Sequence, residues 1–207
     1  MSPCFIINVR NERVVLIVQV LKDELRHKIL LESEHLFLQR GYDRTSLQMI
    51  ADKVNISKSN LYHYFKNKEE LFYELTDSAA DGLKRMILRF RSMRFDLNMD
   101  AQEFRMLLTE EVLSLLLAEK YGLLLIMEQA NGTRYENLRP VMIELIASKI
   151  VSMLADEENS PMMAQIMARN LVDGTVHILK NRVRPSEVRA GLNQLIIYHT
   201  QGMHALQ

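Results

Sequence analysis

Apolar residues recur along this chain at the three- and four-residue spacing of amphipathic helices, not with the alternation of strands. Leu25, Ile29, Leu36 and Phe37 form the first such stripe, and Gly41 follows it as a helix stop. Further helices are predicted over residues 68–91, over one or two segments that end at 131–132, and over 134–155, 161–181 and 186–203. The pattern therefore predicts an all-α fold.

Residues 1–20 differ from the rest, because the segment CFIINVRNERVVLIVQV is rich in isoleucine and valine. Its RNER tetrapeptide is compatible with a turn, so a hairpin or an irregular arm is one interpretation. The interpretation that we favour is an extension of unclear role that contributes little to the working domain.

Residues 45–71, TSLQMIADKVNISKSNLYHYFKNKEEL, contain three helix starts in quick succession. Thr45 and Gln48 have the spacing of a capping box, which predicts a helix from Thr45 to about residue 53. Asn55 then tolerates a left-handed backbone conformation, so it can turn the chain sharply.

Ser57 can cap a second, short helix over about residues 58–65. Asn67 and Glu70 have the spacing of another capping box, which begins a third helix. Helix, tight turn and short helix make up the helix-turn-helix unit, whose second helix lies in the major groove of DNA.

The short helix has one narrow apolar edge when its residues are placed at about 100° intervals. Leu61 and Phe65 share that edge and are predicted to be buried. The core beneath them is predicted to come from Ile50, Ala51 and Val54. The exposed face carries donors and acceptors suited to base edges and phosphates.

Charge is unevenly distributed, although the 26 basic and 26 acidic residues cancel. Residues 44–68 hold five cations and one anion, a net +4, so the rest of the chain sums to −4. A local basic patch on a neutral molecule suits contact with a polyanion at one end. An ordinary solvated basic surface explains the charge equally well.

The segment GYDRTSLQMIADKVNISKSNLYHYFKNKEELF resembles the DNA-binding segment of the TetR family of transcriptional regulators. The resemblance covers about residues 25–75, and Asn55 stands where the family usually has glycine. It implies a three-helix DNA-binding domain at residues 21–68, which we call the head. It also implies a helical domain for effector binding and dimerisation at residues 69–207, which we call the body.

The resemblance further implies a role for each matching residue. The side chains that would face bases are Lys58, Ser59, Asn60 and His63, and Tyr62 would join this contact set. Phosphates would be bound by Tyr64 and Lys68, together with the amides and hydroxyls of Thr45 and Ser46. A helix N-terminus favours anions, and Lys68 lies at one. Tyr62 packing against the domain and His63 as a plain surface residue remain alternatives.

The body is expected, from the same resemblance, to bind a small ligand and to form a homodimer through its last two helices. Their stripes contain Leu171, Gly174, Ile178, Leu179, Leu192, Leu195, Ile196 and His199, and Gly174 and Gly191 allow close helix approach. Two-fold symmetry would impose a palindromic operator on double-stranded DNA. The alternative is that these stripes belong to the core of one chain.

Eleven of the 13 methionines lie at or beyond Met86, and methionine adapts to varied apolar ligands as well as filling cores. The pocket candidates are Met127, Met142, Met163, Met167 and His177. We expect the ligand to release a repressor from DNA. The alternative is an architectural or protein-interaction protein that binds DNA without a small-molecule effector.

Neither a catalytic site, a metal site nor a cofactor is predicted. His199 and His204 are not four residues apart, and no phosphate-binding glycine loop is present. The single cysteine, Cys4, fits a reducing compartment, and no apolar run approaches a membrane span or a secretory signal. We therefore expect a cytoplasmic DNA-binding regulator and not an enzyme.

Overall fold

The computed structural model describes residues 9–92, 110–152, 154 and 160–204, and these residues form helices and connecting turns without a strand. The helices are α1 (Val9–Arg40), α2 (Leu47–Val54), α3 (Lys58–Leu61), α4 (Lys68–Ser92), α6 (Glu110–Ala118), α7 (Lys120–Gln129), α8 (Leu138–Val151), α9 (Ser160–Asn181) and α10 (Pro185–His204). The predicted all-α class is confirmed.

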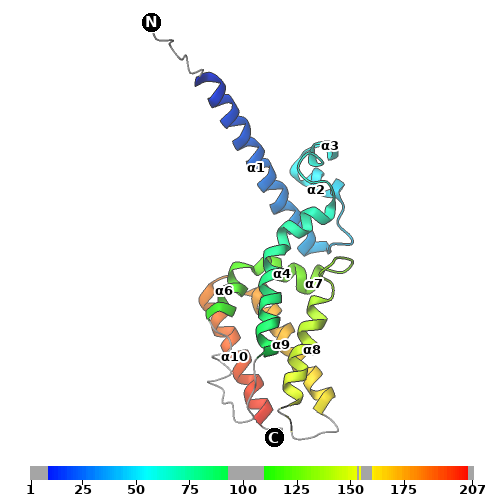
Figure 1. Ribbon diagram of the computed structural model, residues 1–207, viewed down its shortest axis with the longest axis vertical. Coiled ribbons are helices and arrows are strands. Elements are labelled where there is room, and N and C mark those ends of the chain that lie inside the picture. Colours follow the sequence, from blue (N-terminus) through cyan, green and yellow to red (C-terminus); the bar gives the residue numbers. More distant parts are fainter. Residues whose placement is uncertain (1–8, 93–109, 153, 155–159, 205–207) are drawn as a thin grey trace.

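The head and the body are joined by α4, which starts beside α2 and α3 and continues between the body helices (Figure 1). The first half of α1 extends away from the molecule on the side opposite the C-terminus (Figure 1). The helices α6 to α10 form the body around the second half of α4.

The hairpin interpretation of residues 1–20 is wrong for residues 9–20, which belong to the continuous helix α1. Residues 1–8 lie outside the described residues. The segment contains no glycine or proline within residues 9–20, and β-branched residues favour a strand only where a partner strand is present. Val20 and Leu21 are 47% and 58% exposed, so this part of α1 is not part of the core.

An aromatic cluster forms the centre of the head and crosses the predicted boundary at residue 68. Phe37 of α1 and Phe72 of α4 are fully buried, with ring centroids 5.3 Å apart and an edge-to-face geometry. Tyr42, in the turn after α1, packs 5.0 Å from Phe72 in the same way. Such pairs favour this geometry, so α4 is held firmly against α1.

Two basic side chains of α1 hold the helix-turn-helix in place. The guanidinium of Arg26 lies 5.0 Å from the ring centroid of Phe65 and forms an ion pair with Glu74 of α4. The ammonium of Lys28 donates to the carbonyl oxygen of Val54, at the end of α2. These contacts connect α1 to both neighbouring elements and leave the opposite side of α3 uncovered.

The body helices follow the predicted order. The segment that ends at Asn131 and Gly132 was predicted to form one or two helices, and its described part forms two, α6 and α7, separated at Glu119. Helix α8 begins at Leu138 and not at residue 134, because Arg134 and Tyr135 are held in the preceding loop by hydrogen bonds to Asp77. Residues 153 and 155 at its predicted end lie outside the described residues.

Helices α9 and α10 pack closely within one chain. A Cβ at Gly174 would lie 2.9 Å from both Cδ atoms of Leu195, and one at Gly191 would lie 3.2 Å from Ile178. The predicted close approach at both glycines is therefore confirmed inside a single chain. The fully buried members of the predicted stripes, Leu179, Leu192, Ile196 and His199, belong to the interior of that chain.

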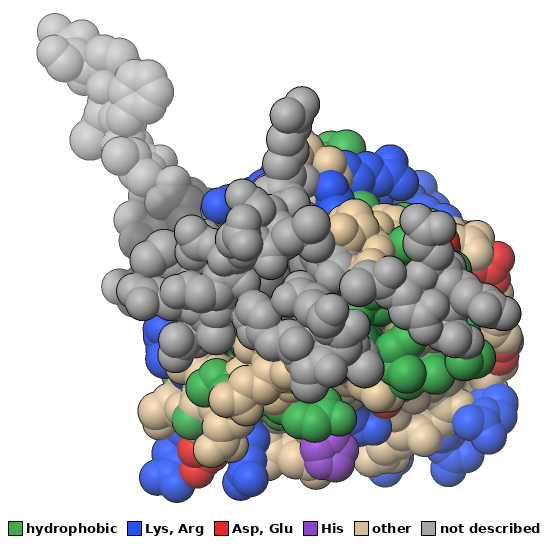
Figure 2. All heavy atoms as spheres, turned by 90° about the horizontal axis from the view of Figure 1, so that it is seen from below, with side chains coloured by type: hydrophobic (Ala, Val, Ile, Leu, Met, Phe, Trp, Pro, Cys, Tyr) green, Lys and Arg blue, Asp and Glu red, His purple; other side chains and the backbone are tan. Residues whose placement is uncertain are grey.

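The surface at the end of the body far from the head combines apolar and basic side chains. Viewed from that end, hydrophobic side chains reach the surface beside lysine and arginine side chains (Figure 2). Among the exposed apolar residues of the last two helices are Met162 and Ile166 of α9 and Tyr198 of α10.

The substitution Gly122→Ala is expected to destabilise the protein through the contact of α7 with α4. An added Cβ would lie 2.8 Å from the Cβ of Ala79 and 2.9 Å from the backbone oxygen of Leu75, neither of which can rotate away. Gly202→Ala on α10 is the matched control, because nothing lies within 4 Å of its Cβ position.

Both variants gain the same helix propensity, so the difference between their free energies of unfolding isolates the steric effect. Overpacking of this kind costs about 1–3 kcal/mol. Urea denaturation followed by circular dichroism measures that difference. Equal stability of the two variants would contradict the close packing of α4 and α7.

Candidate nucleic-acid interface

The turn between α2 and α3 depends on the left-handed backbone of Asn55, with φ of 64° and ψ of 48°. Asn55 is the only described residue other than glycine with a positive φ. Its N–H donates to the carbonyl oxygens of Ala51 and Asp52, and the N–H of Ile56 donates to Ala51. The predicted sharp turn is confirmed, and it sets the angle between the two helices.

The cap of α2 is Ser46 and not Thr45. The Ser46 hydroxyl accepts a hydrogen bond from the N–H of Met49, and the helix begins at Leu47. Thr45 is only 2% exposed, and its hydroxyl donates to the carbonyl oxygen of Gly41 at 2.8 Å. This differs from its predicted role, because a hydroxyl turned into the head is not presented to a phosphate.

Helix α3 is capped by Ser57, as predicted, through a hydrogen bond from the N–H of Asn60. The regular helix ends at Leu61, four residues before the predicted end. The N–H groups of His63 and Tyr64 bond three residues back, so residues 62–64 continue as a tighter turn. The side chains of residues 58–64 therefore remain on one short segment.

The short helix has the predicted apolar edge. Leu61 is 0% and Phe65 is 1% exposed, and both belong to the core with Ile50, Ala51 and Val54. The remaining positions are polar. Lys58, Ser59, Tyr62 and His63 are exposed, whereas Asn60 and Tyr64 are half-buried and Tyr64 packs against the core. At 47% exposure Tyr62 projects from the domain, beside the ammonium of Lys58.

Lys68 lies at the start of α4, where the N–H of Glu70 is capped by the side chain of Asn67 as predicted. Its ammonium donates to the carbonyl oxygen of Tyr42 at 2.7 Å and lies 3.9 Å from the Tyr42 ring centroid. Burial lowers the pKa of Lys68, and the carboxylate of Asp43 opposes that shift. An ammonium has three donors, so Lys68 keeps further N–H groups for an anion.

The phenol of Tyr42 stays protonated at neutral pH. Burial, followed by the carboxylate of Glu69, raises the pKa of Tyr42 to about 12. Its ring is therefore a neutral face on which the Lys68 ammonium rests, and a cation over an aromatic face is an attractive arrangement.

The head contacts the body at a junction between the turn after α1 and the end of α7. The side-chain amide of Asn131 donates to a carboxylate oxygen of Asp43 at 2.9 Å. The N–H of Tyr42 donates to the carbonyl oxygen of Gln129. Gly132 has a φ of 76°, a backbone conformation that favours glycine, and a Cβ there would lie 2.8 Å from an Asp43 oxygen.

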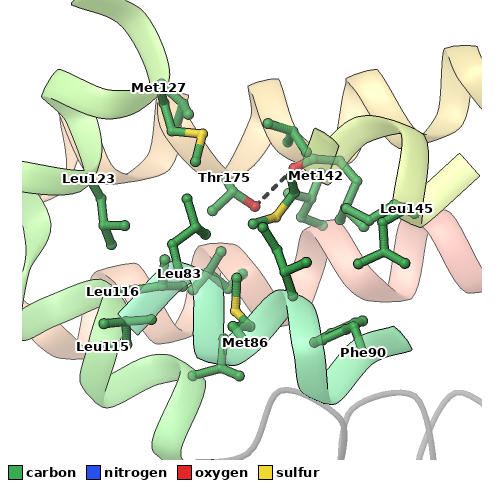
Figure 3. A pocket seen from close by; sticks show the side chains of 18 of the residues that line it. Leu83, Met86, Phe90, Leu115, Leu116, Leu123, Met127, Met142, Leu145 and Thr175 are labelled. Carbon is green, nitrogen blue, oxygen red and sulfur yellow. Dashed lines mark hydrogen bonds between the residues drawn. The ribbon is translucent and has the colours of Figure 1, made fainter. Parts of the chain in front are cut away.

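A cavity of about 150 Å³ lies inside the body, and helices α4, α6, α7, α8, α9 and α10 contribute to its wall. Its labelled side chains converge on one space, and they are leucines, three methionines, Phe90 and Thr175 (Figure 3). Of the predicted pocket residues, Met127 and Met142 line it.

The other three predicted pocket residues are not on the cavity wall. Met167 is buried in the core, Met163 is half-buried against the core, and His177 is exposed on α9. The sequence prediction missed Thr175 and His199 as wall residues. His199 was assigned to a helix stripe, and only the packing of six helices reveals that it borders a cavity.

Within residues 9–92, 110–152, 154 and 160–204, no helix is both long and apolar enough to cross a membrane. Within the same ranges, no three histidine, cysteine or acidic side chains are grouped in a way that could hold a metal ion.

Residues 29–75 match the family described as bacterial regulatory proteins, tetR family. The negative transcriptional regulator IcaR of the icaADBC biofilm operon of Staphylococcus epidermidis is 34% identical over 65 residues, 31% of this chain and 35% of IcaR. The transcriptional activator FasR of Mycolicibacterium smegmatis is 34% identical over 62 residues, 30% of this chain and 28% of FasR. The match thus spans about a third of the length of these curated relatives.

The fold of most of the chain is also found in solved structures. SCO3833, a member of the TetR transcriptional regulator family from Streptomyces coelicolor A3, aligns with 84% of this chain and 90% of its own, with a TM-score of 0.54. The sequence identity is 20%, so this likeness shows the fold alone.

The substitution Asn55→Ala is expected to lower the free energy of unfolding by about 1 kcal/mol, because alanine is strained at positive φ. Asn55→Gly is the matched control and should keep near wild-type stability, since glycine adopts this conformation freely. Urea denaturation of both variants measures the difference. If alanine and glycine were equally tolerated, the left-handed turn would not be a constraint on the fold.

Proposed function

We propose that this chain is a dimeric transcriptional repressor, because its residues 29–75 match the family described as bacterial regulatory proteins, tetR family. It binds a palindromic operator in double-stranded DNA and is released by a small ligand. The observation that carries the proposal is the polar outer face of residues 58–64, which rests on the buried edge of Leu61 and Phe65. A protruding polar helix of this size suits the wet, charged major groove.

Base contacts are assigned to Lys58, Ser59, Asn60 and His63, with Tyr62 beside them. All five side chains are exposed or half-buried on one short segment, and each offers a donor, an acceptor or a ring face to a base edge. The hydroxyl of Ser59 also lies 3.0 Å from that of Ser57, so the cap restrains its position.

Phosphate contacts are assigned to Tyr64, Lys68 and the start of α2 at Ser46. The first N–H groups of a helix have no partner within the helix, and they attract an anion. The carbonyl oxygen of Tyr42 accepts a hydrogen bond from the Lys68 ammonium and so orients the Lys68 side chain. The Thr45 hydroxyl donates to the carbonyl oxygen of Gly41 and so stabilises the turn before α2. Thr45 is not proposed to contact a phosphate itself.

The homodimer is proposed to form through α9 and α10, with the surface that the core of one chain leaves exposed. Met162 and Ile166 are four residues apart on α9 and are 61% and 45% exposed, and Tyr198 on α10 is 66% exposed. Burying such residues against a second copy is favourable, and a two-fold interface uses the same patch on both chains. The two heads then address two half-sites.

The ligand is proposed to act through α7, which reaches from the cavity to the head. Leu123 and Met127 line the cavity, and Gln129 and Asn131 contact the turn after α1. A ligand that favours one position of α7 would favour one spacing of the two heads. It changes DNA affinity only if it binds the two states with different affinity.

Selection of duplexes from a random pool at near-physiological salt should yield a palindrome with half-sites about one DNA turn or more apart. Lys68→Ala is expected to weaken binding to all sequences and to reduce the salt slope by about 1, since one phosphate contact is lost. His63→Ala should relax one position in each half-site, at a cost of about 1–3 kcal/mol in discrimination.

The matched control is Lys84→Ala, which removes an exposed lysine of the body and should leave both the consensus and the salt slope unchanged. Absence of any enriched sequence, or an enriched site without two-fold symmetry, would overturn the proposed dimeric regulator. In cells, a reporter behind the selected operator should be expressed more strongly when the protein is removed. A fall in expression would instead indicate an activator.

The junction at Asp43 is expected to fix the spacing of the two heads. Asp43→Ala and Asn131→Ala each remove the same hydrogen bond, so their effects on affinity for the full palindrome should be non-additive. Binding to an isolated half-site should change little, because residues 58–64 are unchanged in both variants. Titration of both duplexes with the two single variants and the double variant provides the cycle.

Asp43→Asn is the control for this cycle, since an amide oxygen still accepts from Asn131 and should retain most of the affinity. Additive effects of the two alanine variants, or an equal loss of affinity for the half-site, would contradict a role of the junction in head spacing.

A further inference from the structure

The wall of the body cavity is apolar apart from a few groups. Leucine, isoleucine, valine, methionine and Phe90 provide nearly all of it, and the polar wall residues are Thr175, Lys149 and His199. The Thr175 hydroxyl donates to the carbonyl oxygen of Leu171 at 2.8 Å (Figure 3). The Lys149 ammonium donates to the carbonyl oxygen of Arg91. Both groups therefore have partners within the protein.

His199 differs from these two residues. Its side chain is on the cavity wall, the residue is 4% exposed, and Nε2 has no hydrogen-bond partner among the described residues. A buried polar atom without a partner costs about 1–3 kcal/mol, and such atoms are rare in folded proteins. An atom of this kind beside a cavity indicates a partner that enters the cavity.

The charge state of His199 restricts that partner. Burial lowers the pKa of the imidazole, so the ring is neutral at neutral pH and has one N–H donor and one acceptor nitrogen. A neutral ring in an apolar wall does not compensate the desolvation of an ion. The atom that bonds to Nε2 is therefore an uncharged oxygen.

The size of the cavity restricts the rest of the molecule. An apolar protein cavity of comparable volume, about 150 Å³, is large enough for benzene. Methionines from α4, α7 and α8 reach the space and adapt readily to the shape of an apolar ligand (Figure 3).

We propose that the cavity binds a small, largely apolar molecule that carries one uncharged hydroxyl or carbonyl group, and that this group forms a hydrogen bond with Nε2 of His199. As the effector of the regulator, this molecule rests on the proposed function. Its binding to the cavity does not, because the wall residues and the unpartnered nitrogen belong to the folded chain alone.

Phenol and toluene are the matched probes, since they have the same number of heavy atoms and differ by one hydroxyl. Calorimetric titration of the full-length protein gives the ratio of their affinities. The ratio of phenol to toluene affinity should fall about tenfold in His199→Leu, which corresponds to the loss of one hydrogen bond. Thr200→Val on the same helix is the matched control, because the buried Thr200 hydroxyl donates to the carbonyl oxygen of Ile196 and lies outside the cavity wall, and it should leave the ratio unchanged.

The conservative variant His199→Asn, which keeps a hydrogen-bonding group, should recover part of the preference for phenol. A second measurement needs no substitution: the imidazole ¹⁵N resonances of His199 in the wild-type protein should shift with phenol and not with toluene. This measurement tests the hydrogen bond to His199 even if the leucine variant fails to fold.

An unchanged affinity ratio in folded His199→Leu, equal resonance shifts with both probes, or no binding of either probe would overturn the proposed ligand class. Operator binding by the ligand-free protein is measured separately with the selected duplex. Loss of phenol discrimination with intact operator binding would refute only the ligand class. Intact discrimination without any operator binding would refute only the proposed regulator.

Discussion

The edge-to-face packing of Phe72 against Phe37 and Tyr42 is the interaction on which the other parts of this structure depend. It fixes the first turns of α4 within the head, whereas the later turns of the same helix carry Leu83 and Ile87 on the wall of the body cavity. A helix transmits its position over its whole length. Head and body are therefore connected by one continuous helix. A change of packing at one end of α4 also displaces the residues at its other end.

A second connection between head and body joins the turn after α1 to the residues after α7. The Asn131 amide bonds to Asp43, one residue after Tyr42, whose carbonyl oxygen holds the Lys68 ammonium. The proposed phosphate contact is thus separated from α7 by a short series of polar contacts. Surface-exposed contacts of this kind contribute little to stability, and small energies suffice to shift an equilibrium between two head spacings.

Local sequence signals predicted the helix-turn-helix well, because each depends on groups a few residues apart. The left-handed Asn55, the caps at Ser57 and Asn67, and the buried edge of Leu61 and Phe65 are all of this kind. One prediction differed from the structure although the groups involved are only a few residues apart. Thr45 has the spacing of a cap, but the carbonyl oxygen of Gly41 accepts its hydroxyl and Ser46 caps the helix instead.

The sequence by itself thus determined the helical class, the helix-turn-helix and the polar face of residues 58–64, since hydrophobic periodicity and capping act within one or two turns. Only the tertiary structure decided which residues of the body face a cavity. Met127 and Met142 line it, whereas Met163, Met167 and His177 do not, although all five are ordinary helical positions. The unpartnered nitrogen of His199 arises from the packing of six helices around one space, and no short-range pattern encodes that arrangement.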